Sequence, residues 1–271
     1  MKKRQFSIFL IVIAAVIALA FSLILTQQTS TDHSSSALPH LKIGYATYPP
    51  FTNYNENGDL IGIDADFAKE TCRRIGYEAD FIPIDWTEKD QLLKDHTIDC
   101  IWCGFSMDGQ NEKYQWAGPY MKNRHLPIVL ADSPYQTAAD LSGKPIAVLA
   151  NSQTEYLLLN HQDFIEIPTT DQVYCFSDLL EVRSALLDGY CEAIYANAIV
   201  WNNLLEEEKE TYRFLDRDSY LSDLGIAFSK DTDPALIAKI NHTLEEMNRD
   251  GTSFSILQNY HLETDYSIPS E

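Results

Sequence analysis

Short apolar runs alternate with longer amphipathic stretches along most of the chain, which is the pattern of strands joined by helices. In the first half, the predicted elements are strands at 41–45, 79–84 and 98–103 and helices at 64–75 and 89–93. Gly76, directly after the first helix, is a typical helix stop signal. Repeated strand–helix–strand units predict an α/β fold with mixed, mostly parallel sheets and helices on both faces.

The pattern begins again after residue 144, which predicts a second lobe of similar plan. Its expected elements are strands at 145–149, 164–167 and 191–196 and helices at 152–159 and 178–187. Ser152 and Glu155 have the spacing of a capping box at the start of the first of these helices. A helix that begins at Asp233-Pro234 and ends near Gly251, and a short helix at 254–260, are expected to close the chain.

The N-terminal segment is typical of a membrane anchor or a signal peptide. Basic residues at 2–4 precede an apolar run over 6–25, close to the roughly 20 residues that span a bilayer. Because basic flanks stay in the cytoplasm, the rest of the chain is expected to face outward. A small-residue cleavage site fits at 18–20, but the apolar run continues beyond it, which favours an uncleaved anchor. Both alternatives stay open, and the polar residues 26–36 are expected to form a tether.

Charge and cysteine content narrow the choice of partners and cofactors. A net charge of −20 argues against nucleic acid and anionic lipid as partners of the folded part. Cys100 and Cys103 have the spacing of a redox pair, but they fall inside an apolar strand, where a lowered thiol pKa is not expected. A second cysteine pair for zinc is missing, so neither a metal nor a cofactor is predicted. The odd total of five cysteines leaves at least one unpaired, and a bridge between Cys72 and Cys100 stays open.

Five short motifs carry a resemblance to a known family. They are Gly44-Tyr45-Ala46-Thr47-Tyr48-Pro49-Pro50-Phe51, Gly62-Ile63-Asp64-Ala65-Asp66-Phe67-Ala68, Gly104-Phe105-Ser106-Met107, Trp116-Ala117-Gly118-Pro119-Tyr120 and Ala193-Ile194-Tyr195-Ala196-Asn197. In this order and spacing they resemble the extracytoplasmic solute-binding proteins of family 3 over about residues 40–265. The resemblance implies a two-lobed type 2 periplasmic-binding-protein fold, with a hinge of two strands at 125–131 and 224–229. The implied organisation is an anchor or signal peptide with tether at 1–36, lobe 1 at 37–125, lobe 2 at 126–223, and residues 224–271 returning to pack on lobe 1.

The same resemblance implies a function outside the cytoplasm. A monomer would capture an amino acid or a related small polar solute between its lobes and present it to an ABC permease or a sensor. It would sit at the outer face of the cytoplasmic membrane if anchored, or be secreted or periplasmic if cleaved. Two alternatives are a sensing or interaction domain with a degenerate site and a dehydratase-like enzyme on the same fold. Asp108 is the one carboxylate expected in the cleft, and no catalytic triad or zinc-protease motif occurs, so no catalytic residue is assigned.

Candidate ligand-binding residues follow the strands, because open α/β sheets bind ligands beyond the carboxyl ends of their strands. In lobe 1 they are Tyr45 and Tyr48 after the first strand, Trp86 after the second, and Gly104, Phe105 and Ser106 after the third. A residue as small as Gly104 lets a ligand approach the backbone closely. In lobe 2 the resemblance adds Ser152 and Gln153, at a helix N-terminus that suits an anion.

Two residues depart from the family pattern. Where the family has an arginine for the α-carboxylate, this chain has Asn111, or Gln110 if the loop shifts by one residue. Where the family has an aspartate for the α-ammonium, it has Asn197. A charge-assisted hydrogen bond contributes roughly 1.5–3 kcal/mol, about twice a neutral one. Free α-amino acids are therefore predicted to bind weakly, and a modified amino acid or a small peptide to bind better, unless bases such as Lys122 or Arg124 replace the clamp.

Overall fold

The computed structural model describes residues 38–160, 167–208, 210–215 and 219–262. Residues 39–271 belong to one structural unit and the first 38 residues to another. None of the helices within the described residues is both long and apolar enough to cross a bilayer. The apolar run over 6–25 lies outside the described residues.

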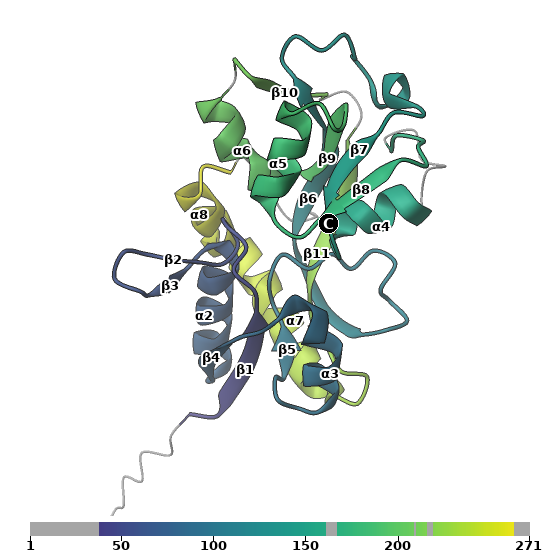
Figure 1. The fold of residues 1–271 in the computed structure, drawn as a ribbon. Coiled ribbons are helices and arrows are strands. Elements are labelled where there is room, and N and C mark those ends of the chain that lie inside the picture. The colour runs from purple at the N-terminus through teal and green to yellow at the C-terminus, as the bar shows by residue number, and fades with distance from the viewer. Residues whose placement is uncertain (1–37, 161–166, 209, 216–218, 263–271) are drawn as a thin grey trace, which may run out of the picture. The chain divides into compact units, whose positions relative to one another are not determined.

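Lobe 1 is built on three parallel strands. β1 (His40–Tyr45) lies between β4 (Glu78–Pro83) and β5 (Cys100–Ile101). The connections carry α2 (Ile63–Ile75), the 3-10 turn η1 (Trp86–Glu88) and α3 (Lys89–Lys94), and a small hairpin of β2 (Asn53–Tyr54) and β3 (Leu60–Ile61) precedes α2. As predicted, α2 ends at Gly76, whose φ of 75° places it in the left-handed conformation that glycine adopts readily. The hairpin projects from the side of lobe 1 beside α2 (Figure 1).

Lobe 2 repeats the plan of lobe 1. β7 (Ile146–Leu149) lies between β8 (Val173–Phe176) and β9 (Ala193–Asn197), again in parallel. The helices are α4 (Gln153–Asn160), α5 (Leu179–Leu187) and α6 (Ala198–Glu207), with a 3-10 turn η2 (Ala138–Leu141) before β7. α5 begins where the sequence predicts, because the Asp178 side chain accepts a hydrogen bond from the backbone N–H of Glu181.

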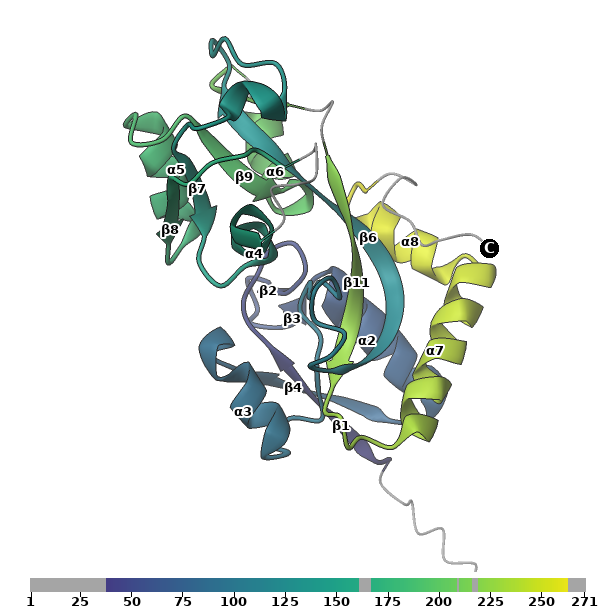
Figure 2. The same cartoon turned by 90° about the vertical axis from the view of Figure 1, so that its right-hand side faces the viewer.

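Two long antiparallel strands run through both lobes. β6 (Gln115–Leu130) and β11 (Tyr220–Phe228) pair with each other from His125–Tyr220 to Gln115–Phe228. β11 also pairs with β5 of lobe 1, and β6 pairs with β9 of lobe 2 and with the short β10 (Tyr212–Phe214). The described strands other than β2 and β3, which pair with each other in a separate two-stranded sheet, thereby form one sheet in the order β4-β1-β5-β11-β6-β9-β7-β8, with β10 added on β6. Figure 2 shows both long strands passing from one lobe to the other.

Separate sets of buried side chains fill the two lobes. One set surrounds Phe67, Trp102 and Tyr120 in lobe 1, and another surrounds Val148, Ile194 and Trp201 in lobe 2. Each of these six side chains is buried. Burying a large apolar side chain contributes about 1.5–3 kcal/mol, so each lobe has a hydrophobic core of its own. The space between the two cores is where a cleft can form.

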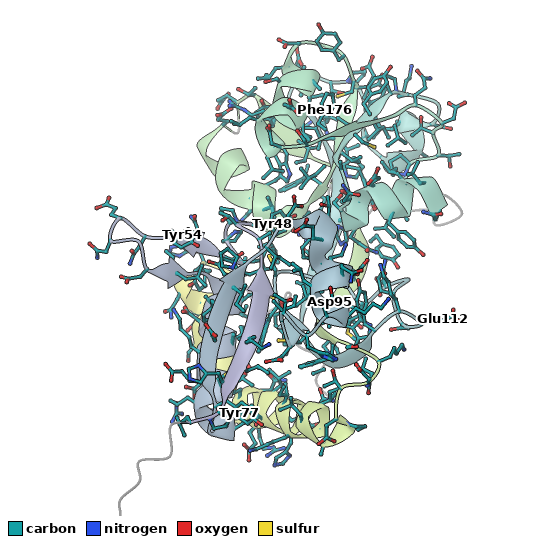
Figure 3. The ribbon with its side chains drawn as sticks, turned by 60° about the horizontal axis from the view of Figure 1, so that its bottom comes forward. Tyr48, Tyr54, Tyr77, Asp95, Glu112 and Phe176 are labelled. Atoms are coloured by element: carbon teal, nitrogen blue, oxygen red, sulfur yellow. The ribbon has the colours of Figure 1, made fainter. Side chains whose placement is uncertain are left out.

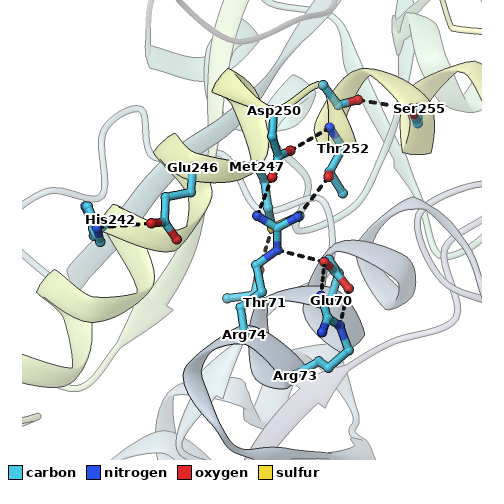
Figure 4. A network of polar contacts seen from close by, with 11 residues as sticks. Glu70, Thr71, Arg73, Arg74, His242, Glu246, Met247, Asp250, Thr252 and Ser255 are labelled. Atoms are coloured by element: carbon cyan, nitrogen blue, oxygen red, sulfur yellow. Dashed lines mark hydrogen bonds and ion pairs between the residues drawn. The ribbon is translucent and has the colours of Figure 1, made fainter.

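The two C-terminal helices pack against α2. α7 (Pro234–Arg249) starts as predicted, with the Asp233 side chain accepting from the Ala235 N–H and proline in the first turn, and α8 (Thr252–Asn259) follows. Arg74 of α2 donates to Asp250 at 2.6 Å and to Thr252 at 2.8 Å (Figure 4). Glu70 lies between Arg73 and Arg74 and accepts from both guanidinium groups. This network ties the C-terminal helices to lobe 1.

Several predicted elements need correction. The strand expected at 98–103 is limited to Cys100–Ile101, because the chain leaves the sheet into the loop that begins at Cys103. Of the strand expected at 164–167, residues 164–166 lie outside the described residues and Ile167 lies in a bend. The edge strand is instead β8, formed by the apolar run Val173-Tyr174-Cys175-Phe176, which was not predicted. The hinge strands are longer than the apolar segments at 125–131 and 224–229.

Helix α6 and the short strands β2, β3 and β10 were not predicted. α6 follows β9 without any connecting loop, so its apolar start merges with the apolar strand in the sequence. The proposed lobe boundaries at 125/126 and 223/224 fall within β6 and β11. We retain them as proposed boundaries, with the two strands shared by both lobes.

Candidate functional site

A cavity of about 350 Å³ lies between the two lobes. Its walls come from the segments at the ends of strands: 46–48 after β1, 103–106 after β5, 149–154 after β7 and 194–197 in β9. These ends meet because the parallel strands of both lobes point toward the space between them. The volume is in the range of small-molecule sites, which is roughly 300–1,000 Å³.

Most of the residues selected from the sequence line this cavity. They are Tyr48, Trp86, Gly104, Phe105, Ser106, Ser152, Gln153 and Asn197. Tyr48 stacks on Phe51 with ring centroids 5.6 Å apart, and its hydroxyl accepts from Asn197 Nδ2 at 3.5 Å. Figure 3 shows Tyr48 where lobe 1 approaches lobe 2, whereas Tyr54 lies out on the β2–β3 hairpin. Burial raises the pKa of the Tyr48 hydroxyl, so it stays protonated and able to donate.

Tyr45 and Asn111 do not line the cavity. The Tyr45 ring is buried edge-on against Phe81, and its hydroxyl makes a hydrogen bond with Tyr54. The side chain of Asn111 is exposed, and the backbone carbonyl of this residue accepts a hydrogen bond from Lys230 Nζ at 3.1 Å. Gln110, the alternative that the sequence left open, lines the cavity.

An aromatic wall covers the lobe 1 side of the cavity. Trp86 and Phe105 meet edge to face with centroids 5.1 Å apart, and Phe105 packs on Trp116 at 5.2 Å. The indole N–H of Trp86 donates to the carbonyl of Asn151 in lobe 2 at 3.2 Å. Trp86 therefore supplies an apolar surface to a ligand and a direct link between the lobes.

A buried carboxylate positions the backbone at the floor of the cavity. Asp64 accepts hydrogen bonds from the N–H of Gly104 and from the Tyr120 hydroxyl. Gly104 has a φ of 57°, and a Cβ there would lie 3.1 Å from the Phe51 ring, so this position requires glycine. Burial raises the pKa of Asp64 to about 7, against the two hydrogen bonds, which lower it. The hydrogen bond from the Gly104 N–H to Asp64 thereby holds the segment that carries Phe105 and Ser106 in place.

In lobe 2, Ser152 caps the start of α4 as predicted, but the Glu155 side chain accepts from a different N–H than the capping box predicts. Ser152 Oγ accepts from the Glu155 N–H at 3.3 Å, as expected of a cap. The Glu155 carboxylate, however, accepts from the N–H of Asn151 at 2.6 Å rather than from that of Ser152. Asn197 acts similarly for α6, since its Oδ1 accepts from the Ile199 N–H at 3.0 Å.

Sequence reasoning missed two cavity residues on β6, Asn123 and His125. His125 Nε2 lies 2.8 Å from Ser222 Oγ on β11 and 3.4 Å from Asn123 Nδ2. Burial lowers the pKa of His125 to about 3, so the ring is neutral near pH 7. Lys122, which precedes Asn123, and Arg124, which lies between Asn123 and His125, do not line the cavity. Asn123 and His125 share one face of β6 because they are two residues apart, but residues 122–125 are all polar, so no alternation in the sequence marks that face.

The charged residues that line the cavity are both basic. Lys89 and Lys113 are at the wall, and among the described residues no aspartate or glutamate lines it. Lys113 is paired with Asp90, whose other oxygen accepts from the Tyr114 hydroxyl. Lys89 Nζ lies 4.9 Å from the centre of the Trp86 ring, and burial lowers its pKa. Sequence reasoning did not select either lysine.

All five cysteines are free thiols, so the bridge between Cys72 and Cys100 is not formed. Cys103 is buried, as the sequence predicts, and its thiol donates to the Ala46 carbonyl at 3.1 Å. Burial raises the pKa of Cys103 to about 12. Within the described part of the chain, no group of three histidine, cysteine or acidic residues is placed to hold a metal ion.

Comparisons with known proteins agree in pointing to one family. The model of the bacterial extracellular solute-binding proteins, family 3, matches residues 41–263. The ABC transporter arginine-binding protein 1 of Escherichia coli is 27% identical over 82% of this chain and 91% of its own length. The L-cystine-binding protein TcyJ of Escherichia coli is 27% identical over 76% of each chain. A histidine-bound substrate-binding protein of an ABC uptake transporter from Streptococcus pneumoniae superposes with a TM-score of 0.74, at 25% identity, over 88% of this chain and 99% of that one.

Proposed function

Because the chain belongs to the bacterial extracellular solute-binding proteins of family 3, we propose that it captures an amino acid or a close derivative in the interlobe cavity for uptake through an ABC transporter. Membership of this family makes it a binding protein rather than an enzyme. Relatives that match over most of their length include proteins named for binding arginine, cystine and histidine, which supports a ligand of this size.

The observation that carries the proposal is the make-up of the cavity. Both lobes contribute to its wall, with Trp86, Ser106 and Gln110 on one side and Ser152 and Asn197 on the other. Aromatic rings, hydroxyls and amides are the groups that bind a small polar solute with an apolar part. A ligand that contacts both walls stabilises the arrangement in which they face each other.

Hinge closure follows from the two shared strands. The lobes are connected through β6 and β11, and closure needs rotation about only these two strands and the loops beside them. Contacts already bridge the cleft, from Trp86 Nε1 to the Asn151 carbonyl and from Asn197 Nδ2 to the Tyr48 hydroxyl. A bound solute adds to these contacts and shifts the population toward the closed form, which a permease or a sensor then reads.

We further propose that residues 1–36 hold the protein at the outer face of the membrane as an uncleaved anchor and polar tether, and that the folded part is a monomer. The alternative is cleavage near Ala20, with release of the folded part. Mass spectrometry of the protein from cell membranes decides between them, because only an anchored chain retains the apolar run over 6–25.

The function is tested by thermal unfolding and calorimetry of the full chain, purified in a mild detergent, against the common amino acids and their N-acetyl and amide derivatives. A ligand at 100 times its Kd stabilises the folded state by about 2.7 kcal/mol. The Ser106→Leu variant should lose this stabilisation, because the side chain of Ser106 is at the wall and buried. Ser255→Leu, at an exposed position on α8 that does not line the cavity, is the matched control. Absence of stabilisation by every compound would contradict the proposal.

A further inference from the structure

We infer that the ligand of this site is a carboxylate-bearing solute with a net negative charge, whose nitrogen is an uncharged amide rather than an ammonium group, and that Lys89 is the residue that selects it. The inference rests on the proposed function and names the class of solute within it. It depends on which charges line the cavity and on which of them already have a partner.

Lys89 is the cation available to a ligand. It is half-buried at the cavity wall, and within the described residues no carboxylate forms an ion pair with it. Its Nζ makes one long contact of 3.4 Å to the Trp86 carbonyl and lies over the Trp86 ring. Glu88 and Asp90 flank Lys89 in the chain, but neither makes an ion pair with it, and Asp90 is engaged by Lys113 and Tyr114. Asp90 still attracts the Lys89 ammonium, but a partly desolvated ammonium that has no ion pair of its own gains further from contact with an anion.

The lobe 2 wall favours negative charge as well. The first turn of α4 lines the cavity through Ser152, Gln153 and Thr154. The first N–H groups of a helix lack intrahelical partners, and the helix dipole makes this end attractive to anions. Ser152 Oγ accepts the N–H of Glu155, whereas the N–H groups of Gln153 and Thr154 have no hydrogen-bond partner among the described residues. Lys89 and these donors lie in opposite lobes, so an anionic solute contacts both.

Within the part of the chain that the structure describes, the cavity has no corresponding site for a positively charged group of a ligand. Among the described residues no carboxylate lines it, and Asn197, whose Oδ1 already accepts from the start of α6, is uncharged. An ammonium group in this site would be desolvated without a counterion, which costs free energy. An amide nitrogen carries no charge and needs only an acceptor such as the side chain of Gln110. Cationic amino acids are therefore the solutes that this site excludes most strongly.

The test is a charge series measured by calorimetry on the full chain in detergent, at low and at moderate salt. The probes are N-acetyl-L-glutamate, N-acetyl-L-glutamine, L-glutamate, L-glutamine and L-arginine. L-Glutamate and L-glutamine are nearly the same size. N-acetylation converts the ammonium group of each into an uncharged amide that carries an acetyl group. We expect an N-acetyl probe, whose nitrogen is an uncharged amide and whose net charge is negative, to bind tightest, at least tenfold tighter than L-glutamine, and L-arginine to show no detectable binding. The tenfold preference should shrink as salt is raised.

Variants then test Lys89 itself. Lys89→Gln should weaken binding of the preferred anionic probe at least tenfold. Lys89→Arg, which keeps the charge, should retain most of the affinity for that probe. Lys94→Gln, at an exposed position at the end of the same short helix, should change it less than twofold. Thermal unfolding of each variant without ligand checks that the fold is intact.

The outcomes separate the inference from the proposed function. Tightest binding of L-glutamate, L-glutamine or L-arginine, or an affinity for the anionic probe that is unchanged in Lys89→Gln, would overturn the inference and leave the function standing. If no probe in the series and no amino acid in the wider panel binds, the proposed function fails and the inference fails with it.

Discussion

Asp64 and Tyr120 connect the first helix of lobe 1 to a hinge strand through a buried hydrogen bond of 2.8 Å from the tyrosine hydroxyl to the carboxylate. The same carboxylate holds the Gly104 N–H at the floor of the cavity. A single ionisable group therefore contacts the helix start, the hinge and the ligand site. Its protonation state should affect the stability of all three.

The first prediction is a pH dependence of stability that originates in Asp64. An unfolded aspartate has a pKa of about 3.9, and burial raises the folded value to about 7. The folded state thus holds the proton more tightly, so this stabilisation is fully present below about pH 4 and is lost as pH rises to about 7. We expect the free energy of unfolding from urea titrations to contain this fall, and Asp64→Asn to remove it. A fall of the same size in Asp64→Asn as in Asp171→Asn, an exposed control, would contradict the assignment.

The second prediction concerns the two amides that replace the family's ionic clamp. Asn197→Asp keeps the acceptor for the α6 N–H groups and places a carboxylate in the cavity. Combined with Gln110→Arg, it should strengthen binding of at least one zwitterionic amino acid by about tenfold or more, roughly 1.4 kcal/mol, in calorimetry. Asn111→Arg with Asn197→Asp is the matched control, because Asn111 lies off the cavity. An equal gain in both double variants would contradict a role for position 110, and a larger gain with Asn111→Arg would mean that residue 111 faces the ligand instead.

The third prediction is an order of thiol reactivity. Cys175 is the exposed cysteine of the five, and the other four are buried. Burial raises the pKa of Cys103 to about 12 and that of Cys175 to about 11, so both thiols are protonated near neutral pH. A thiol reagent in native buffer at pH 8 should label Cys175 slowly, leave Cys103 unlabelled, and reach all five in denaturant. Mass spectrometry of the labelled peptides measures this. Labelling of Cys103 before Cys175 would show that the cavity floor opens.

The fourth prediction concerns the network between α2 and the C-terminal helices. Hydrogen bonds from Arg73 and Arg74 hold the pKa of Glu70 down at about 2. The stabilisation from Glu70 is therefore present above its unfolded pKa of about 4.3 and is lost as pH falls toward 2. Glu70→Gln should lower stability by about 1 kcal/mol at pH 7 and have little effect near pH 2. Denaturant titrations at both pH values measure it, with Glu56→Gln, on the exposed β2–β3 turn, as the control.

The sequence determined those parts of the structure that depend on neighbours along the chain. The Gly76 stop of α2, the Asp178 and Asp233 caps and the cores of β1, β4 and β7 follow from local periodicity and capping chemistry. Seven of the eight chosen residues at the cavity wall follow the end of a strand, and the eighth, Asn197, is the last residue of β9. Such signals reside in a few consecutive residues.

Only the tertiary structure decided which side chains share the cavity. Lys89 and His125 come from a short helix and a hinge strand, and nothing near them in the sequence marks them as facing the same space. Gln110 lines the cavity and Asn111 does not, because the conformation of the loop depends on segments remote in sequence. One of these contributes the Lys230 side chain, which donates to the backbone carbonyl of Asn111. Tyr45 turned into the core because the register of β1 with β4 sets its direction. Side-chain direction in loops and strands is fixed by packing between distant segments, which local sequence patterns do not record.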